Sequence, residues 1–252
     1  MISEWEANMT ISRPMRLLLA PAAGLLLVGS TASAQRYSEG YSAEGQRIEQ
    51  SVEVLQTLTN ARDGDIPGDL LERAEGVVVI PSFVRGGLIV GAEHGDGIMS
   101  MREPNGRGWS APAFVSLSGG SVGAEIGLQA TDLVLLVMNR DAADVLLGNE
   151  FTFGGSVSIA EGPVGRSVVA SSDLSMSAKI LAYSRSRRIF AGLTLDGATL
   201  RSDAEANARF YGRRVSTGDI VLNGEWVPSR IPVVASRWQD TLQGLAGMAT
   251  GN

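Results

Sequence analysis

The chain of 252 residues has no cysteine, and it has one histidine and one lysine, His94 and Lys179. The absence of cysteine excludes a disulfide framework and the lipid-modified cysteine that tethers bacterial lipoproteins, so stability depends on packing. With one histidine, zinc would have to be held mainly by carboxylates, which is uncommon. We therefore predict no metal site and no cofactor.

Acidic residues outnumber basic ones, 27 against 21, and the formal net charge is −6. Nucleic acid binding needs concentrated cationic surface, so we expect no nucleic acid partner. Nearly all of the positive charge is arginine, whose planar guanidinium suits phosphate and carboxylate groups. A GC-rich genome would produce the same excess without functional meaning, so arginine content alone decides nothing.

The first 34 residues have the layout of an export signal. Arg13 and Arg16 precede an apolar core at 17–30, and the small residues of 31–34 suit cleavage after Ala34. The apolar core is shorter than the roughly 20 residues of a membrane span, although a retained anchor is the alternative interpretation. We expect a signal peptide at 1–34 and an exported protein of the periplasm or outer-membrane periphery.

The rest of the chain has the length of one domain, which we place at 43–246 after a flexible polar lead at 35–42. Apolar residues recur every three or four positions from Ala43 to Arg62, as in Ile48, Val52 and Leu55, which predicts an amphipathic helix. A short helix is expected after Pro67.

Short β-branched runs follow, separated by glycine and typical of strands. The expected strands are 77–80, 87–92, 98–102, 113–117, 121–129, 133–138, 156–160, 167–171, 179–186 and 189–195. The sequence 140–149 adds a helical piece, the capping-box pattern Ser202–Glu205 predicts a helix through Tyr211, and 232–247 reads as a final amphipathic helix. The predicted fold class is α+β, a glycine-rich and mainly antiparallel β core flanked by N- and C-terminal helices.

Two patterns invite a catalytic or metal-binding interpretation. Residues 119–123, "GGSVG", match the G-x-S-x-G turn that presents a serine nucleophile, here Ser121. Hydrolases with this turn place their histidine after the serine, whereas His94 precedes it, so an esterase is disfavoured. Glu93, His94 and Asp96 could contribute to a metal site, but we expect them to form a polar loop.

Two arginine clusters are candidate ligand-binding surfaces. Arg185, Arg187 and Arg188 form the first, and Arg213 and Arg214 form the second. In a strand Arg185 and Arg187 would share one face, so that two guanidinium groups could meet a phosphate-bearing surface. A solvated rim with nearby carboxylates is the alternative interpretation.

The stretch 76–99 sets two apolar β-branched runs around a proline and an arginine. Together with "WSAPAF", "GGSVGAEIG", "TDLVLLVMN", "GPVGR", "AYSRSRRIFAGLTLDGATL" and "NARFYG", it resembles the SYLF domain family over residues 50–225. The positions that carry the resemblance are Gly76, Pro81, Arg85, Gly87, Gly91, Gly95, Gly97, Trp109, Pro112, Asp132, Gly162, Pro163, Arg166 and Tyr211. Several motifs in one order are more specific than any one of them.

The resemblance implies a lipid-binding module without enzymatic activity, because family members bind phosphoinositides and other acidic phospholipids. Some eukaryotic members also bind actin, which an exported protein would not meet, so we expect no actin partner. Eukaryotic members insert an N-terminal amphipathic helix into the bilayer, whereas the helix here carries Glu44, Glu49 and Glu53 and should bind membranes poorly. Glu125 and Arg188 replace the family's common Gln and Gly, and Arg188 shifts the expected lipid contact toward the sheet rim.

Two hypotheses follow for a non-enzymatic protein of the bacterial cell envelope. The first is binding of acidic phospholipids or a membrane surface through arginines, with Arg185, Arg187 and Arg188 as the main contacts. Weaker candidates for the same role are Arg85, Arg166, Arg213 and Arg214. The second is a structural or adaptor protein that binds an envelope protein partner through its glycine-rich sheet.

Overall fold

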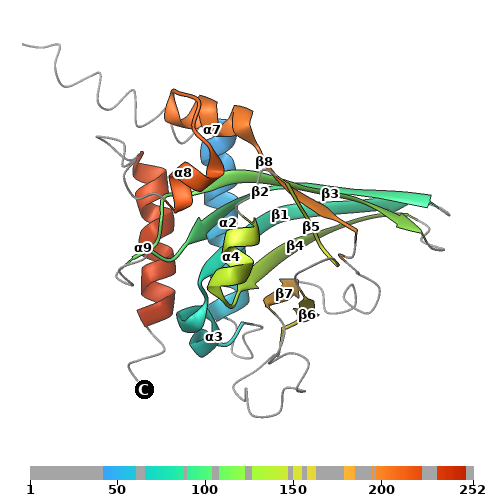
Figure 1. Cartoon of the computed structure of the whole chain (residues 1–252), viewed down its shortest axis with the longest axis horizontal. Helices are drawn as coiled ribbons and strands as arrows, with labels where there is room; N and C mark the ends of the chain where they lie inside the picture. The colour runs from blue at the N-terminus through green and yellow to red at the C-terminus, as the bar shows by residue number, and fades with distance from the viewer. Residues whose placement is uncertain are drawn as a thin grey trace, which may run out of the picture.

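The computed structural model describes residues 42–60, 66–87, 90–103, 108–122, 127–146, 150–154, 158–162, 179–184, 195, 197–222 and 232–247. Within them one sheet of eight strands is flanked by six helices (Figure 1), which confirms the α+β class. The strands are β1 (Gly76–Gly87), β2 (Val90–Met101), β3 (Ala113–Val122), β4 (Gly127–Val137), β5 (Glu150–Thr152), β6 (Ile159–Glu161), β7 (Ile180–Ser184) and β8 (Thr199–Ser202). The helices are α2 (Ala43–Asn60), α3 (Gly68–Arg73), α4 (Arg140–Leu146), α7 (Ala204–Tyr211), α8 (Thr217–Val221) and α9 (Val233–Gly247).

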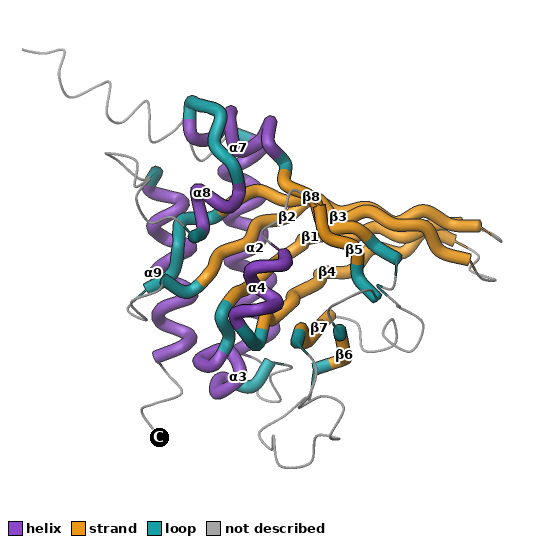
Figure 2. The backbone as a smooth tube through the Cα atoms, viewed as in Figure 1, coloured by secondary structure: helices purple, strands orange, loops and turns teal. Residues whose placement is uncertain are grey.

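The strand order is β5-β8-β3-β2-β1-β4-β7-β6, and all described pairs are antiparallel except β6 with β7. The four longest strands, β3, β2, β1 and β4, lie at the centre. Their hairpin ends extend past the helices, to the right in Figure 2. The sheet is therefore helix-covered at one end only.

Both faces of the covered end are buried in apolar cores. Val77 and Val79 face the helix layer, which we define as α2, α3 and α9, whereas Val78 and Ile80 face α4 and α8. Strands buried on both faces contain continuous apolar runs rather than alternating ones, which explains "VVVI" at 77–80.

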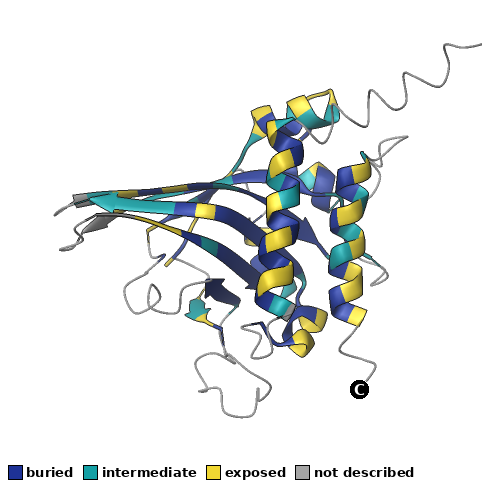
Figure 3. Cartoon of the chain, turned by 180° about the vertical axis from the view of Figure 1, so that it is seen from behind, coloured by how far each residue is buried: buried dark blue, intermediate teal, exposed yellow. Residues whose placement is uncertain are grey.

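The two long helices lie side by side against one face of the sheet, with their buried sides toward it (Figure 3). Ile48 and Leu55 of α2 and Trp238 of α9 are fully buried. The Trp238 indole N–H donates a hydrogen bond to Ser100 Oγ of β2 at 2.8 Å. The spacing of apolar residues in the sequence thus predicted the buried side of α2 correctly. The described part of α2 ends at Asn60.

The central strands differ from the sequence expectation. Three separate strands were expected at 77–80, 87–92 and 98–102, but the structure has two long strands there, β1 and β2. Gly87 of β1 pairs with Gly91 of β2 next to the hairpin end. The strand expected at 121–129 covers the end of β3 and the start of β4. Glycine was interpreted as a strand boundary, whereas here glycine lies inside strands.

Three further expectations were wrong or incomplete. The residues Glu93, His94 and Asp96 do not form a polar loop but lie within β2. The helix α7 is capped by Asp203, whose side chain accepts a hydrogen bond from the Ala206 N–H, because Ser202 belongs to β8. The strands β5 and β8 and the helix α8 were not predicted. The predicted strand at 156–160 appears as β6, from Ile159 to Glu161.

Several predictions lie outside the described residues. These are the signal peptide at 1–34, the lead at 35–41, Arg62, Glu125, the strand at 167–171, and 189–194 of another strand.

Candidate functional site

Four family positions meet at a bend in β1. The register of β1 shifts by one residue against both neighbours, between Val79 and Val84 toward β2 and between Ile80 and Phe83 toward β4. Pro81 and Ser82 occupy this bulge, and Ser82 has a φ of 54°. Proline cannot donate to a ladder, so a bulge is where a central strand tolerates it. Asp132 Oδ1 of β4 accepts a hydrogen bond from the Ser82 N–H at 3.1 Å.

The glycines Gly95 and Gly97 of β2 let β1 approach closely at the same bend. A Cβ on Gly97 would collide with the Val79 carbonyl oxygen, and one on Gly95 would lie 2.6 Å from Ile80 Cγ2. Elsewhere, Gly76 lies against Met101 and Gly162 against the Tyr183 ring, again with no room for a Cβ. These positions build the bend and its packing.

The aromatic family residues Trp109 and Tyr211 are also part of the packing. The Arg102 guanidinium lies 4.5 Å from the Trp109 ring centroid, and Arg102 also donates hydrogen bonds to the backbone carbonyls of Ala74 and Glu72. The Tyr211 hydroxyl donates to the Pro112 carbonyl at 2.6 Å, and burial raises the pKa of Tyr211 above its ordinary value. Burial likewise raises the pKa of Tyr183.

The N-terminal amphipathic helix α2 is fastened to the body of the protein at its polar edge. Arg209 Nε of α7 lies 2.6 Å from Glu44 Oε1, and Arg237 Nη1 of α9 lies 2.6 Å from Glu49 Oε2. Arg47 pairs with Asp203 at 3.0 Å. Since the apolar side of α2 is buried and Glu44, Arg47 and Glu49 are ion-paired, the helix is a structural element in this arrangement.

Among the predicted lipid contacts that the structure describes, Arg85 has the least access to solvent. Its side chain is 11% exposed, and its Nε lies 3.7 Å from Oε2 of Glu93, which is 2% exposed. The two residues pair across β1 and β2 near the hairpin end. A buried ion pair costs desolvation of both partners, so moving Arg85 to a headgroup would leave Glu93 as a buried charge.

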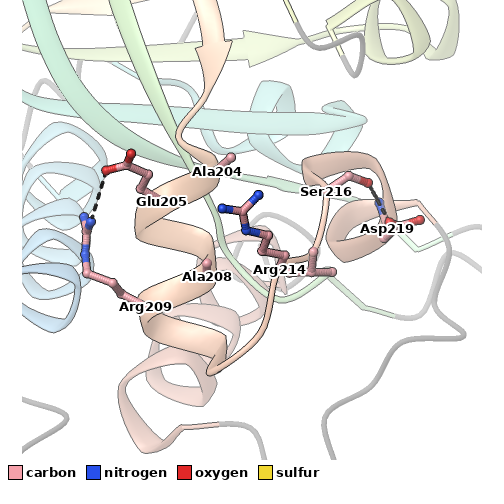
Figure 4. A pocket seen from close by; sticks show the side chains of 8 residues that line it. Ala204, Glu205, Ala208, Arg209, Arg214, Ser216 and Asp219 are labelled. Carbon is pink, nitrogen blue, oxygen red and sulfur yellow. Dashed lines mark hydrogen bonds and ion pairs between the residues drawn. The ribbon is translucent and has the colours of Figure 1, made fainter.

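Arg213 and Arg214 are both exposed, directly after the C-terminal end of α7, where Gly212 adopts a φ of 70°. Arg214 borders an open groove of about 810 Å³ between α7 and α8 (Figure 4), and the structure records no ion pair between it and a described carboxylate. We call this the α7–α8 groove. The residues that line it are Ala204, Glu205, Ala208, Arg209, Arg214, Val215, Ser216 and Asp219.

The remaining predicted contacts fall where the structure describes nothing. Arg185, Arg187 and Arg188 lie outside the described residues, and so do Arg166 and the family position Pro163. The structure therefore brings together Arg213 and Arg214 and places Arg85 in a separate region. Sequence reasoning missed the groove, because Glu205 and Asp219 look like ordinary helix-capping acids.

The residues considered for catalysis and metal binding lack the required geometry. Ser121 continues a regular ladder opposite Gly91, which is not the strand-to-helix turn of a nucleophile elbow. His94 Nε2 lies 3.5 Å from Asp96 Oδ1. Glu93, which precedes His94 in the same strand, is buried and points to the opposite face. In the part of the chain that the structure describes, no three His, Asp or Glu side chains gather as metal ligands.

Comparison with known proteins decides the family. The model described as "Ysc84: Las17-binding protein actin regulator" matches residues 118–245, about half of the chain. The chain belongs to this family. It is the family recognised above as SYLF. The Ysc84 family is described by binding and regulation, and its description names no reaction.

The Ysc84 relatives include animal and yeast proteins. "SH3 domain-containing YSC84-like protein 1" from Rattus norvegicus is 35% identical over 167 residues, and that from Homo sapiens is 34% identical. Each match covers 66% of this chain and 48% of the relative. "LAS seventeen-binding protein 3" from Saccharomyces cerevisiae is 34% identical over 171 residues, 36% of its length. The chain thus spans about half the length of the animal relatives that it matches.

None of the described helices combines the length and the apolar content that a membrane span requires.

Proposed function

We propose that this protein is a non-enzymatic, exported protein of the bacterial cell envelope that binds acidic phospholipid headgroups through arginines. It works at the periplasm or the outer-membrane periphery. It therefore meets neither actin nor nucleic acid. Arg185, Arg187 and Arg188 are the main proposed contacts, and Arg213 and Arg214 are weaker candidates for the same role.

The observation that carries the proposal is the contrast between Arg214 and the ion-paired arginines. Arg47, Arg209 and Arg237 each lie within ion-pair distance of a carboxylate from another element. Arg214 is exposed beside an open groove and has no recorded carboxylate partner among the described residues. An arginine without an internal partner keeps its donors available for a phosphate.

The helix layer is a poor alternative as the membrane-facing surface. The exposed side chains of α2 include Gln46, Gln50, Glu53 and Gln56. Arg237, the exposed cation of α9, is paired with Glu49. An anionic bilayer attracts clustered cations at roughly 1 kcal/mol each, and this surface offers no such cluster.

The experiment is sedimentation of the chain from Gln35 onward with phosphatidylcholine vesicles that contain increasing phosphatidylglycerol, at low and physiological salt. Bound protein should rise with anionic lipid and fall with salt, because screening weakens arginine–phosphate attraction. Substitution of Arg185, Arg187 and Arg188 by Ala should abolish binding. Unchanged binding would reject that cluster, and no binding at either salt would reject lipid binding as a whole.

The second candidate is an adaptor that binds an envelope protein through its glycine-rich sheet. The name of the yeast relative, "LAS seventeen-binding protein 3", supports it, because that name describes a protein partner. The extension of the β1–β4 hairpins past the helices offers a surface (Figure 2). This candidate predicts a stable pull-down partner whose binding does not depend on lipid charge.

A further inference from the structure

The α7–α8 groove has a mixed charge that a purely anionic ligand does not match. Two cations, Arg209 and Arg214, and two carboxylates, Glu205 and Asp219, line it. Their formal charges cancel, so an anionic headgroup would meet repulsion from the carboxylates as well as attraction from the arginines. A ligand that carries both signs of charge fits this lining better.

The four charges differ in how far the fold already uses them. Arg209 is held by Glu44 at 2.6 Å, and its Nη1 lies 3.7 Å from Glu205 Oε2. Asp219 Oδ2 accepts a hydrogen bond from Ser216 Oγ at 2.7 Å, which orients the carboxylate at the start of α8. Glu205 is 91% exposed.

Arg214 lies between these carboxylates. Figure 4 shows its guanidinium extending between α7, which carries Glu205, and the segment that carries Ser216 and Asp219. The buried Val215 contributes an apolar wall. An incoming phosphate at Arg214 would therefore have a carboxylate on either side of it, where a neighbouring cationic group of the same ligand could bind.

We propose that the α7–α8 groove is a headgroup site for phosphoethanolamine lipids, with the phosphate on Arg214 and the ammonium group on Glu205 and Asp219. A primary ammonium donates hydrogen bonds to carboxylates, whereas the methylated ammonium of choline cannot. The groove thus selects phosphoethanolamine over phosphocholine. This selection goes beyond the attraction to acidic lipid proposed above, but it rests on lipid binding as the function.

The test compares two vesicle series with equal phosphatidylglycerol, one completed with phosphatidylethanolamine and the other with phosphatidylcholine. The chain from Gln35 onward should bind the ethanolamine series about tenfold more tightly, the value of one charge-assisted hydrogen bond. The double variant Glu205→Gln, Asp219→Asn should bind both series equally. The variant Arg214→Ala should weaken binding to both, because both headgroups contain the phosphate.

A matched control separates selection from net charge. The double variant Glu72→Gln, Asp240→Asn removes two exposed carboxylates of α3 and α9 that do not line the groove, and it should keep the tenfold preference. Soluble glycerophosphoethanolamine should compete with the ethanolamine vesicles for the protein, whereas glycerophosphocholine should not. Because these competitors form no bilayer, this result would show that membrane curvature does not cause the headgroup preference.

The outcomes are distinct. Binding to anionic vesicles without an ethanolamine preference, or a preference that survives in the Glu205→Gln, Asp219→Asn variant, overturns the headgroup site and leaves the proposed function standing. Absence of binding to either series rejects the proposed function and the headgroup site with it.

Discussion

Two arginines of the helix layer, Arg47 and Arg237, differ from Arg214 of the α7–α8 groove in whether a described carboxylate pairs with them. In the helix layer Arg237 joins α9 to α2 through Glu49, and Arg47 joins α2 to the residue that caps α7. At the groove Arg214 has no recorded carboxylate partner in the described part of the chain. Whether an arginine is available to a ligand therefore depends on whether a carboxylate of the protein already pairs with it, and not on how many arginines are adjacent in the sequence.

The same contrast applies to the family positions and the groove. Pro81, Gly95, Gly97 and Asp132 build the bend of β1, where the sheet is tightly packed. Substitutions there should change stability, whereas substitutions at the groove should change binding alone. Four expected changes in stability, given from the largest to the smallest, test whether buried packing and ion pairs stabilise the fold as described.

The largest effect is expected for Gly97→Val. A Cβ at this position would collide with the Val79 carbonyl oxygen and the Ile80 side chain. Overpacking of a well-packed core costs typically 1–3 kcal/mol, and a backbone obstacle cannot rotate away, so the loss should be at least about 3 kcal/mol. Urea denaturation of the wild type and the variant measures it. A loss below 1 kcal/mol would show that the bend tolerates a side chain.

The next effect is expected for Asn207→Ala. Asn207 is fully buried, and its amide group accepts from the Phe114 N–H at 2.9 Å and donates to the Phe114 carbonyl at 3.2 Å. Removing it leaves buried backbone groups with fewer partners, which costs about 2 kcal/mol. Urea denaturation should show this loss, and vesicle binding by the folded variant should be unchanged. Lost binding at unchanged stability would contradict a structural role.

A pH effect follows from Tyr183 and Tyr211, whose pKa values burial raises above the ordinary value of 10.0. The folded state keeps both phenols neutral, so their contribution to stability is complete below pH 10 and is lost as the unfolded chain begins to ionise above it. Each tyrosine should lower the free energy of unfolding by up to about 1.4 kcal/mol per pH unit above 10. Denaturation between pH 8 and 11 measures the slope, which Tyr211→Phe should reduce by half.

The smallest effect is expected for Arg237→Ala, which removes the exposed ion pair with Glu49. Exposed pairs contribute about 0.5 kcal/mol, and salt screens them. The free energy of unfolding should fall by no more than this amount, and the difference should shrink at high salt. A loss of several kcal/mol would mean that α2 depends on this pair rather than on its buried side.

The sequence predicted the parts of the fold in which local pattern and tertiary packing agree. The spacing of Ile48, Val52 and Leu55 predicted α2, and the last amphipathic stretch predicted α9. The strand prediction failed at glycines, because glycine occurs both in turns and inside closely packed strands. Gly95 and Gly97 look like turn residues, but they lie inside β2, where backbone and side-chain atoms of β1 occupy the space that a Cβ would need. No local pattern distinguishes these cases.

The candidate site was less predictable, because it depends on pairs that are distant in sequence. Arg85 looked like an available cation, and its pairing with Glu93 across the β1–β2 hairpin follows only from the register. Arg214 and Asp219 were visible as ordinary charges. Their position on one groove depends on the turn at Gly212 and on Val215, which is buried in the same core cluster as Ile220 and Val221 of α8.

The most direct test of the whole account compares two charge reversals, Arg214→Glu at the groove and Arg73→Glu on α3. Both arginines are exposed, and neither has a recorded ion pair with a described residue. The helices α3 and α7 lie at opposite ends of the helical side in Figure 1. Each variant changes the net charge equally, and each should unfold within about 0.5 kcal/mol of the wild type.

Arg214→Glu should weaken sedimentation with vesicles of phosphatidylglycerol and phosphatidylethanolamine by about tenfold, whereas Arg73→Glu should weaken it by less than about threefold. Equal losses in the two variants would mean that only net charge matters, and they would contradict a binding surface at the α7–α8 groove.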